Sequence, residues 1–415
     1  MTQAAEQPAT HFEVVVVGGG MVGAALAALL GQAGVAVALL DARPEPLAAD
    51  EVGKGLPAMR VSALTPVSQR LLEGLGAWPW MAARRVTPYR FMQVWDSEGS
   101  GEVNFSAEQA GVPRLGHIVE NDVILAALER RLAELPTVSM QLGMRVTGLH
   151  ESPVGREVVL EDGRRLSAPL VVACDGAHSP LREMAEIAVK AHDTGHVAVV
   201  TTVRTERGHG DVARQVFLET GPLAFLPLTV GGDERYCSIV WSTSPEEAER
   251  LTTLSREALG HELQAAFEAR LGAVEVVDRA LAVPLSQRHA EHYVQSGFAL
   301  VGDAAHSIHP LAGQGVNLGL MDAAVLAEEL LAARRRGIAL GAPRMLERYS
   351  RCRRGDNAAM LALMDGFRLL FGTRHPLVTL TRNLGLSGVD RLTPIKRLLM
   401  RQAIGERGRL PASCR

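Results

Sequence analysis

The stretch that decides the fold is Val14-Val15-Val16-Val17-Gly18-Gly19-Gly20-Met21-Val22-Gly23, which leads through an apolar run to Asp41. The four valines predict a buried parallel strand, and the residues from about Met21 to Gln32 predict a helix. Val35 to Leu40 predicts the next strand, so the segment is a βαβ unit. Six glycines interrupt the apolar run, and we therefore expect a globular unit here and not a membrane span.

Gly18, Gly20 and Gly23 form a G-x-G-x-x-G pattern between this strand and helix. The first glycine permits a tight turn, the second lets the backbone approach a pyrophosphate, and the third permits close helix–strand packing. The N-terminus of the helix then faces the phosphates with the positive end of its dipole. Asp41 ends the second strand, where a carboxylate accepts a hydrogen bond from a ribose hydroxyl. The pattern fits FAD or NAD, whereas Asp41 would repel the 2′-phosphate of NADP.

A second acidic turn follows a later apolar strand. Phe298 to Val301 predicts a strand that ends at Gly302 and Asp303, where a carboxylate can hold a ribityl hydroxyl. The small residues from Pro310 to Asn317 would let the backbone lie against a flat ring. A helix expected from about Gly315 to Arg335 points its N-terminus at that ring, and its dipole favours an anionic reduced flavin. The loop supplies these candidate cofactor contacts: Gly313, Gln314, Gly315, Val316 and Asn317.

Two further positions complete the predicted cofactor cleft. Asp175 follows the expected strand Leu170 to Ala173, and we expect its turn to close the cleft. Arg60 precedes a helix predicted over Ser62 to Leu75; it either contacts the cofactor or forms a surface salt bridge. His306 and His309 lack an accompanying set of carboxylates or cysteines, so we expect packing or proton relay and no metal site.

The order of expected elements predicts an α/β fold with a discontinuous Rossmann-like FAD-binding domain. Between its parts, several strands follow one another with little helix, which predicts an inserted, mainly antiparallel β-sheet substrate domain. The last part is helical. We assign residues 1–86, 113–186 and 290–342 to the cofactor domain, 87–112 to a substrate-domain hairpin, 187–289 to the substrate sheet and 343–415 to the helical C-terminal region.

Composition narrows the function classes. The formal net charge is −3 and aromatic residues make up 4% of the chain, so we expect no nucleic-acid surface. The four cysteines show no paired spacing, which argues against a disulfide scaffold and favours a reducing, cytoplasmic compartment.

The C-terminal segment from Thr381 to Arg415 is basic, with eight Lys or Arg residues against two acids. An expected helix has an apolar side and a basic side, formed respectively by Leu392, Ile395, Leu398, Leu399 and Ala403, and by Lys396, Arg397 and Arg401. The helix is either a solvated docking helix or a peripheral contact with the inner face of a membrane or with partner subunits. The apolar run from Met360 to Phe371 is a second candidate for that contact.

Taken together, the three strand-end elements resemble the single-component flavin aromatic hydroxylases of the p-hydroxybenzoate hydroxylase superfamily. The strings Arg60–Leu64, Gly116–Asn121 and Ala299–Gly319 are similar to the ubiquinone-biosynthesis hydroxylases within it. This resemblance extends from Glu13 to about Gly385.

Other strings are most similar to the 2-polyprenylphenol hydroxylases, which add the first ring hydroxyl: Met92–Asp96, Ala213–Phe217 and Cys237–Ser242. The alternatives are a hydroxylase of a later ring position or a non-catalytic assembly subunit of the biosynthetic complex. Asp41 departs from the family pattern, in which Glu is frequent.

By this resemblance, NAD(P)H reduces FAD, oxygen adds at flavin C4a, and the distal oxygen of the hydroperoxide is transferred to the ring of a polyprenylphenol. Pro310 would lie near the reacting edge, with Gly313 and Gln314 beside it, and Asn121 would contact FAD. The polyprenyl substrate implies entry from a membrane surface. The resemblance leaves open whether the chain forms a homo-oligomer.

Overall fold

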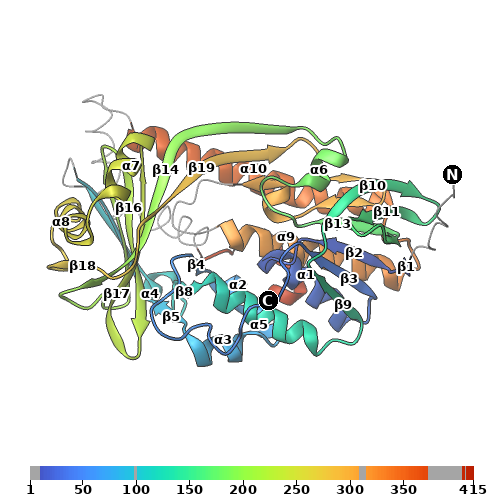
Figure 1. Cartoon of the computed structure of the whole chain (residues 1–415), viewed down its shortest axis with the longest axis horizontal. Helices are drawn as coiled ribbons and strands as arrows, with labels where there is room; N and C mark the ends of the chain where they lie inside the picture. The colour runs from blue at the N-terminus through green and yellow to red at the C-terminus, as the bar shows by residue number, and fades with distance from the viewer. Residues whose placement is uncertain (1–9, 98–100, 308–314, 373–403, 407) are drawn as a thin grey trace.

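The computed structural model describes residues 10–97, 101–307, 315–372, 404–406 and 408–415. Its centre is a six-stranded sheet in which all neighbouring strands are parallel except the first pair. In spatial order the strands are β20 (Val294–Gln295), β21 (Phe298–Leu300), β13 (Leu170–Ala173), β2 (Val14–Val17), β3 (Val37–Asp41) and β9 (Val138–Leu142). Helices α1 (Met21–Gln32), α5 (Asn121–Ala133) and α9 (Gly315–Arg335) pack with this sheet (Figure 1). The predicted α/β cofactor domain is confirmed.

A small sheet flanks this core, with the order β1 (Thr10–His11), β12 (Arg165–Ala168), β11 (Gly155–Leu160) and β10 (Val146–Ser152). The extended chain that follows α5 is divided between β9 and β10. Gly143 lies between them with a φ of 70°, a left-handed conformation that interrupts an extended strand.

The substrate domain is a nine-stranded, mainly antiparallel sheet. Its path is β22 (His306–Ser307), β19 (Leu281–Ala290), β14 (Val189–Thr205), β17 (Asp233–Thr243), β16 (Gly221–Val230), β15 (Val212–Leu218), β6 (Phe91–Asp96) and β7 (Glu102–Ser106), while β18 (Val274–Val276) pairs with β14. The hairpin β6–β7 joins the sheet through a parallel pairing of β6 with β15. This pairing supports the proposed assignment of residues 87–112 to the substrate domain.

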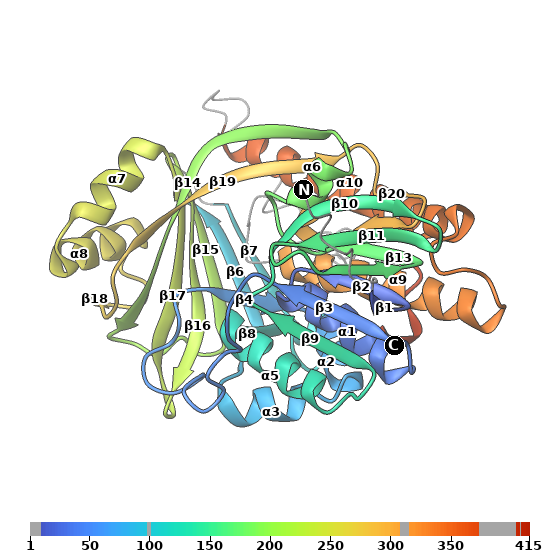
Figure 2. The ribbon, with the colours of Figure 1, turned by 45° about the vertical axis from the view of Figure 1, so that its right-hand side comes forward.

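Helices α7 (Pro245–Thr253) and α8 (Arg256–Ala266) cover one face of the nine-stranded sheet (Figure 2). Apolar side chains of both helices form a buried cluster with the sheet, in which Phe225 stacks on Phe267 with ring centroids 3.7 Å apart. The Ser244 hydroxyl accepts a hydrogen bond from Glu247 N and caps the start of α7. Because this face is filled, the opposite face is the one turned toward the cofactor domain.

The helix predicted over Ser62 to Leu75 begins later than expected. Residues Val61–Leu64 form β4, which pairs with β8 (Gly116–Glu120), and β8 also pairs with β5 (Thr87–Tyr89). Helix α2 (Pro66–Gly74) starts only after Thr65, whose hydroxyl accepts from Ser68 N at 3.2 Å. A residue before proline is disfavoured in helical conformation, so Pro66 sets this boundary.

The described part of the chain also contains these shorter elements: α3 (Trp78–Arg84), α4 (Ala107–Ala110), α6 (Pro180–Met184) and the 3-10 turns η1 (Gly302–Ala304) and η3 (Ala412–Cys414). The C-terminal region contains the long helix α10 (Pro343–Gly372). The final residues pack on α2, where Arg70 Nε donates to Cys414 O at 2.9 Å. Within the described ranges, every helix is too short or too polar to cross a lipid bilayer.

Candidate active site

A cavity of about 610 Å³ is lined by both large sheets, and its volume is typical of small-molecule sites. Nine predicted cofactor residues lie on one wall: Gly18, Gly20, Asp41, Arg60, Asn121, Asp175, Asp303, Gly315 and Val316. The opposite wall is apolar and comes from β14, β16, β17 and β19, through Ala198, Val200, Leu226, Val240, Val283 and Leu285. The cavity therefore joins a polar nucleotide-type surface to an apolar sheet face.

The glycines of the first turn serve different purposes. Gly18 has a φ of 104°, and a Cβ there would lie 2.3 Å from Cys174 O. At Gly23 a Cβ would lie 1.9 Å from Gly18 O, so this glycine permits the close packing of α1 on the turn. A Cβ at Gly20 would meet no atom within 4 Å, and no side chain among the described residues caps the start of α1. The helix N-terminus can therefore receive an anionic group beside Gly20.

Asp41 is held at the end of β3 by two backbone amides. Its Oδ2 accepts from Gly19 N at 2.5 Å, and its Oδ1 accepts from Arg43 N at 2.7 Å. The carboxylate is thereby fixed beside the glycine turn. Further lone pairs on these oxygens can accept hydrogen bonds from the hydroxyls of a ribose.

Asp175 lines the cavity where β13 ends. Its Oδ2 accepts from Leu181 N at 3.1 Å, whereas its Oδ1 is buried with no hydrogen-bond partner among the described residues. Burial raises the pKa of the Asp175 carboxyl. A buried polar atom without a partner is costly, so Oδ1 is suited to a hydrogen bond with a bound ligand.

Arg60 and Asn121 form another edge of the cavity. Asn121 begins α5, and its backbone N donates to Arg60 O at 2.9 Å. The Asn121 amide Oδ1 accepts from Ser62 Oγ at 2.7 Å. Arg60 has an exposed side chain and leads into β4. These contacts place a cation and a polar amide together at the mouth of the same cavity.

Asp303 enters the cavity from η1, directly after β21. Desolvation raises the pKa of the Asp303 carboxyl, while electrostatic interactions with His306 and Arg60 act in the opposite direction. Gly302 precedes it with a φ of 63° and packs against Val22, so it shapes the turn without lining the cavity. The two acidic turns, from distant parts of the sequence, therefore face one cavity.

Asn317, a predicted flavin contact, makes three hydrogen bonds within the protein. Its Oδ1 accepts from Thr65 N at 3.0 Å and from Ser68 Oγ at 2.7 Å, and its Nδ2 donates to Ala63 O at 2.8 Å. These bonds tie the start of α9 to the start of α2, and Asn317 is absent from the cavity lining. Pro310, Gly313 and Gln314 lie outside the described residues.

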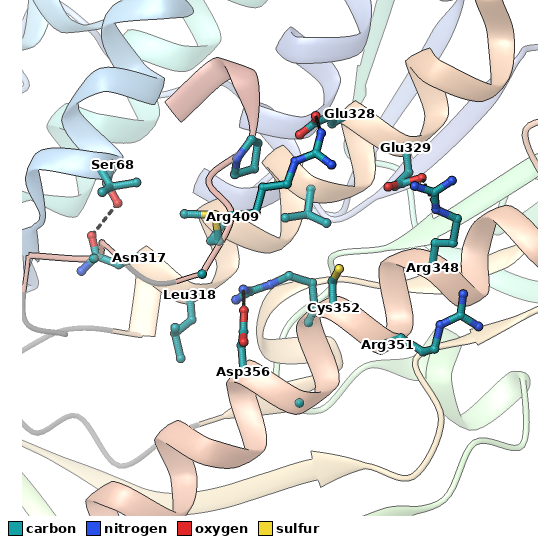
Figure 3. A pocket seen from close by; sticks show the side chains of 18 of the residues that line it. Ser68, Asn317, Leu318, Glu328, Glu329, Arg348, Arg351, Cys352, Asp356 and Arg409 are labelled. Atoms are coloured by element: carbon teal, nitrogen blue, oxygen red, sulfur yellow. Dashed lines mark hydrogen bonds and ion pairs between the residues drawn. The ribbon is translucent and has the colours of Figure 1, made fainter. Parts of the chain in front are cut away.

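Asn317 lines a second cavity of about 520 Å³, bordered by α2, α9, α10 and the chain's last residues (Figure 3). Ion pairs cross its rim, with Arg409 at 3.2 Å from Glu328 and Arg348 at 3.2 Å from Glu329. Asn317 is the one predicted cofactor residue among its described lining residues. This second cavity is therefore separate from the nucleotide-type wall.

The sequence did not predict two groups of residues that line or support the site. The apolar wall follows from strand alternation, but alternation alone does not show which face meets a cofactor. Asp322 lies buried behind Asp303, where Gly302 N donates to its Oδ2 at 3.1 Å. Its one sequence signal is a charge among the buried residues of α9. The described residues contain no group of three or more His, Cys, Asp or Glu side chains that could hold a metal ion.

These residues fit FAD. The open start of α1 suits a pyrophosphate, Asp41 suits a ribose, and the unpaired Asp175 Oδ1 offers a buried acceptor. The cavity also extends past Asp303 to Gly315, at the N-terminus of α9. That helix end favours negative charge on a reduced flavin.

Solved structures share this architecture. The chain is similar to Pseudomonas aeruginosa PqsL in complex with 2-aminobenzoylacetate, with a TM-score of 0.75 and 24% identity over 91% of this chain and 100% of that chain. It is also similar to p-nitrophenol 4-monooxygenase PnpA from Pseudomonas putida, with a TM-score of 0.75 and 21% identity over 97% of this chain and 100% of that chain. At these identities the likeness shows the fold. Fold and site together define a protein of this fold with a cavity that fits FAD.

Sequence comparison places the chain more narrowly. Residues 11–363 match the FAD binding domain family. The chain is 40% identical to 3-demethoxyubiquinol 3-hydroxylase of Escherichia coli, over 95% of this chain and 98% of the relative. It is 39% identical to ubiquinone hydroxylase UbiL of Rhodospirillum rubrum, over 95% and 89% respectively. The human ubiquinone biosynthesis monooxygenase COQ6 is 32% identical, over 94% and 92%.

The chain therefore belongs to the FAD-binding monooxygenase family that contains the ubiquinone hydroxylases. The predicted FAD cofactor, with NAD(P)H and O2 as cosubstrates, agrees with this membership. The narrower resemblance to the 2-polyprenylphenol hydroxylases is not confirmed. The relatives agree better with the alternative prediction, a hydroxylase of a later ring position.

Proposed function

We propose that this enzyme hydroxylates the ring of a polyprenylated phenolic precursor of ubiquinone, at a position later than the first. The observation that carries the proposal is the apolar sheet wall, which faces the nucleotide-type wall across one cavity. The choice of ring position is supported by the 40% identity with a 3-demethoxyubiquinol 3-hydroxylase along almost the full length of both chains.

The cavity residues contribute mainly binding and exclusion of water. Asp41, Asp175 and Asp303 hold polar parts of the cofactor, and the start of α1 receives its phosphates. When bound, reduced FAD activates the oxygen that is transferred to the ring. Side chains such as Val200, Leu226 and Val240 present no polar atom to an apolar substrate and keep the reaction space dry.

The deciding experiment is complementation of bacterial strains that each lack one ubiquinone ring hydroxylase. We expect this gene to restore ubiquinone in the strain that lacks 3-demethoxyubiquinol 3-hydroxylase, with loss of the accumulated precursor measured by mass spectrometry. The empty vector is the control. Restoration only in the strain that lacks the first-position hydroxylase would contradict the proposed ring position.

A second experiment separates an enzyme from a non-catalytic assembly subunit. The purified protein is expected to show the visible absorption band of bound FAD and to consume NAD(P)H and O2 with a precursor quinol. A colourless protein that gains no flavin band on addition of FAD, yet restores ubiquinone in cells, would favour the assembly subunit.

We also propose that the basic C-terminal segment binds a membrane surface where the polyprenyl substrate resides. Lys396, Arg397 and Arg401, which lie outside the described residues, supply the positive charge. Deleting Thr381 to Arg415 is a poor test, because the last residues pack on α2. Replacing the three cations with Gln should instead reduce flotation with anionic vesicles, with neutral vesicles as control. Unchanged flotation would contradict this role.

A further inference from the structure

A buried cluster of charged and polar groups lies behind the second acidic turn. Asp322, on α9, is fully buried. Its Oδ2 accepts from Gly302 N at 3.1 Å and contacts His306 Nε2 at 2.5 Å. Its Oδ1 accepts from Arg353 Nε at 2.6 Å and from Asn357 Nδ2 at 3.3 Å. One carboxylate thus collects four hydrogen-bonding groups from two separate parts of the chain, the Gly302–His306 segment and α10.

This carboxylate is ionised. Burial alone would raise the pKa of Asp322, but electrostatic interactions and hydrogen bonds with His306 and Arg353 lower it to about 2. Burial also acts to lower the pKa of Arg353, and Asp322 overcomes that effect, so the pKa of Arg353 is raised. A buried charge is tolerated when it is paired and hydrogen-bonded, and here both conditions are met.

The contacts of Asp322 lie on either side of the residue that enters the cofactor cavity. Gly302 begins η1 and His306 begins β22, and Asp303 stands between them. The same carboxylate oxygen therefore fixes the chain before and after Asp303. Ser307, the next residue of β22, also lines the cavity.

The cluster extends to the substrate sheet. Asn357 Nδ2 donates to Tyr293 OH at 3.3 Å, and Tyr293 OH contacts His289 Nε2 at 3.0 Å. His289 belongs to β19 and is the register partner of His306 in β22. β19 also supplies Val283 and Leu285 to the apolar wall. The cluster therefore connects this wall with the turn from Gly302 to His306, which is called the cofactor turn below.

We propose that Asp322 is a positioning residue for FAD: its buried carboxylate, held by Arg353, fixes the Gly302–Asp303–His306 turn in the geometry that receives the flavin part of the cofactor. Asp322 does not line the cavity and acts through the turn. This inference depends on FAD binding and is independent of the ring position proposed above. Its tests use no substrate, so the two proposals can fail separately.

The test compares Asp322→Asn and His306→Gln with Asp356→Asn. Asp356 also pairs with Arg353, at 3.0 Å, but it lies on the other cavity and has no contact with the cofactor turn. The dissociation constant of FAD is measured by flavin fluorescence, together with the flavin absorption spectrum, the midpoint potential and thermal unfolding of the apoprotein. We expect Asp322→Asn and His306→Gln to raise the dissociation constant by about tenfold, as for residues that orient a ligand-binding group. The flavin spectra and midpoint potentials of these two variants should also change. Asp356→Asn should keep the wild-type dissociation constant, spectrum and potential.

His306→Gln retains the Asp322–Arg353 ion pair, and it decides the question if Asp322→Asn does not fold. A lowered unfolding temperature with unchanged FAD affinity, spectrum and potential in His306→Gln would overturn the proposal and make the cluster purely structural. Equal loss of FAD affinity in Asp356→Asn would also overturn it, because the effect would then not pass through the turn.

Discussion

Asp41 and Asp303, which enter the cofactor cavity at the end of β3 and after β21 respectively, are supported in different ways. The Asp41 carboxylate accepts hydrogen bonds from Gly19 N and Arg43 N, which belong to the same βαβ unit. The turn that carries Asp303 is instead fixed by Asp322, from the following helix. The hydrogen bonds of Asp41 form within a short segment of sequence, whereas the hydrogen bond between Gly302 and Asp322 requires that α9 is packed in the folded core. The first turn should therefore be sensitive to backbone geometry, and the second to charge.

The largest expected effect is that of Gly18→Ala in the first turn. The added Cβ would meet Cys174 O at 2.3 Å, and Ala would have to adopt a φ of 104°. Overpacking and strain together should cost about 3 kcal/mol of unfolding free energy and abolish FAD retention. Urea unfolding and flavin content measure both effects.

The matched control is Gly20→Ala, where the Cβ meets no protein atom within 4 Å. It should leave the unfolding free energy unchanged and weaken only FAD binding, because the methyl group lies where the pyrophosphate approaches. If the two variants are equally unstable, the first turn is not limited by its packing against β13.

The next effect addresses the second turn through pH. The pKa of Asp322 is lowered to about 2, against an ordinary value of 3.8. Its contribution to stability is therefore complete above pH 3.8 and is lost as the pH falls toward 2. This contribution amounts to about 2 kcal/mol. Urea unfolding across that window should show a shallower pH dependence for Asp322→Asn than for the wild type. Identical slopes would contradict the assigned ionisation.

A smaller effect is expected for Asp41→Asn. The amide loses part of the acceptor capacity for the ribose and for Gly19 N, so the dissociation constant of FAD should rise about tenfold. Asp41→Glu keeps the charge and adds one methylene, and it should recover most of the affinity. Titration of the apoprotein with FAD compares them. Equal affinity of Asp41→Asn and wild type would show that Asp41 serves the protein turn alone.

The smallest effect tests a third kind of support, the tie between α9 and α2. Ser68→Ala removes the hydrogen bond to Asn317 Oδ1 at 2.7 Å and should cost about 1 kcal/mol of stability. FAD affinity should stay unchanged, since neither residue lines the cofactor cavity. A clear loss of FAD affinity would instead favour the flavin contact predicted for Asn317 from the sequence.

The features that could be predicted from the sequence are those whose contacts lie close together along the chain. The βαβ unit and its candidate residues were predictable because strand, turn, helix and acid follow one another within a short segment. The role of Asn317 was not predictable, because Thr65 is 252 residues away along the chain. Likewise, Asp322 meets Arg353 only when α9 packs against α10.

The helix predicted over Ser62 to Leu75 shows a different limit. The apolar spacing suits a helix throughout, but pairing with β8 draws Val61–Leu64 into a strand. Thr65 and Pro66 carry the signal for the true start, and that local signal outweighs periodicity.

Strands β14 and β19 have a mechanical consequence. They pair from Val189 and Ala290, beside β22 and the cofactor turn, to Val200 and Leu281 in the substrate sheet, with a shift of register between Asp193 and His196 (Figure 2). On either side of this shift the hydrogen-bonded double strand resists bending, and it connects the two domains. Domain closure by hinge rotation would have to break this ladder. Substrate and product should therefore exchange through displacement of loops, at a fixed distance between the cofactor wall and the apolar wall.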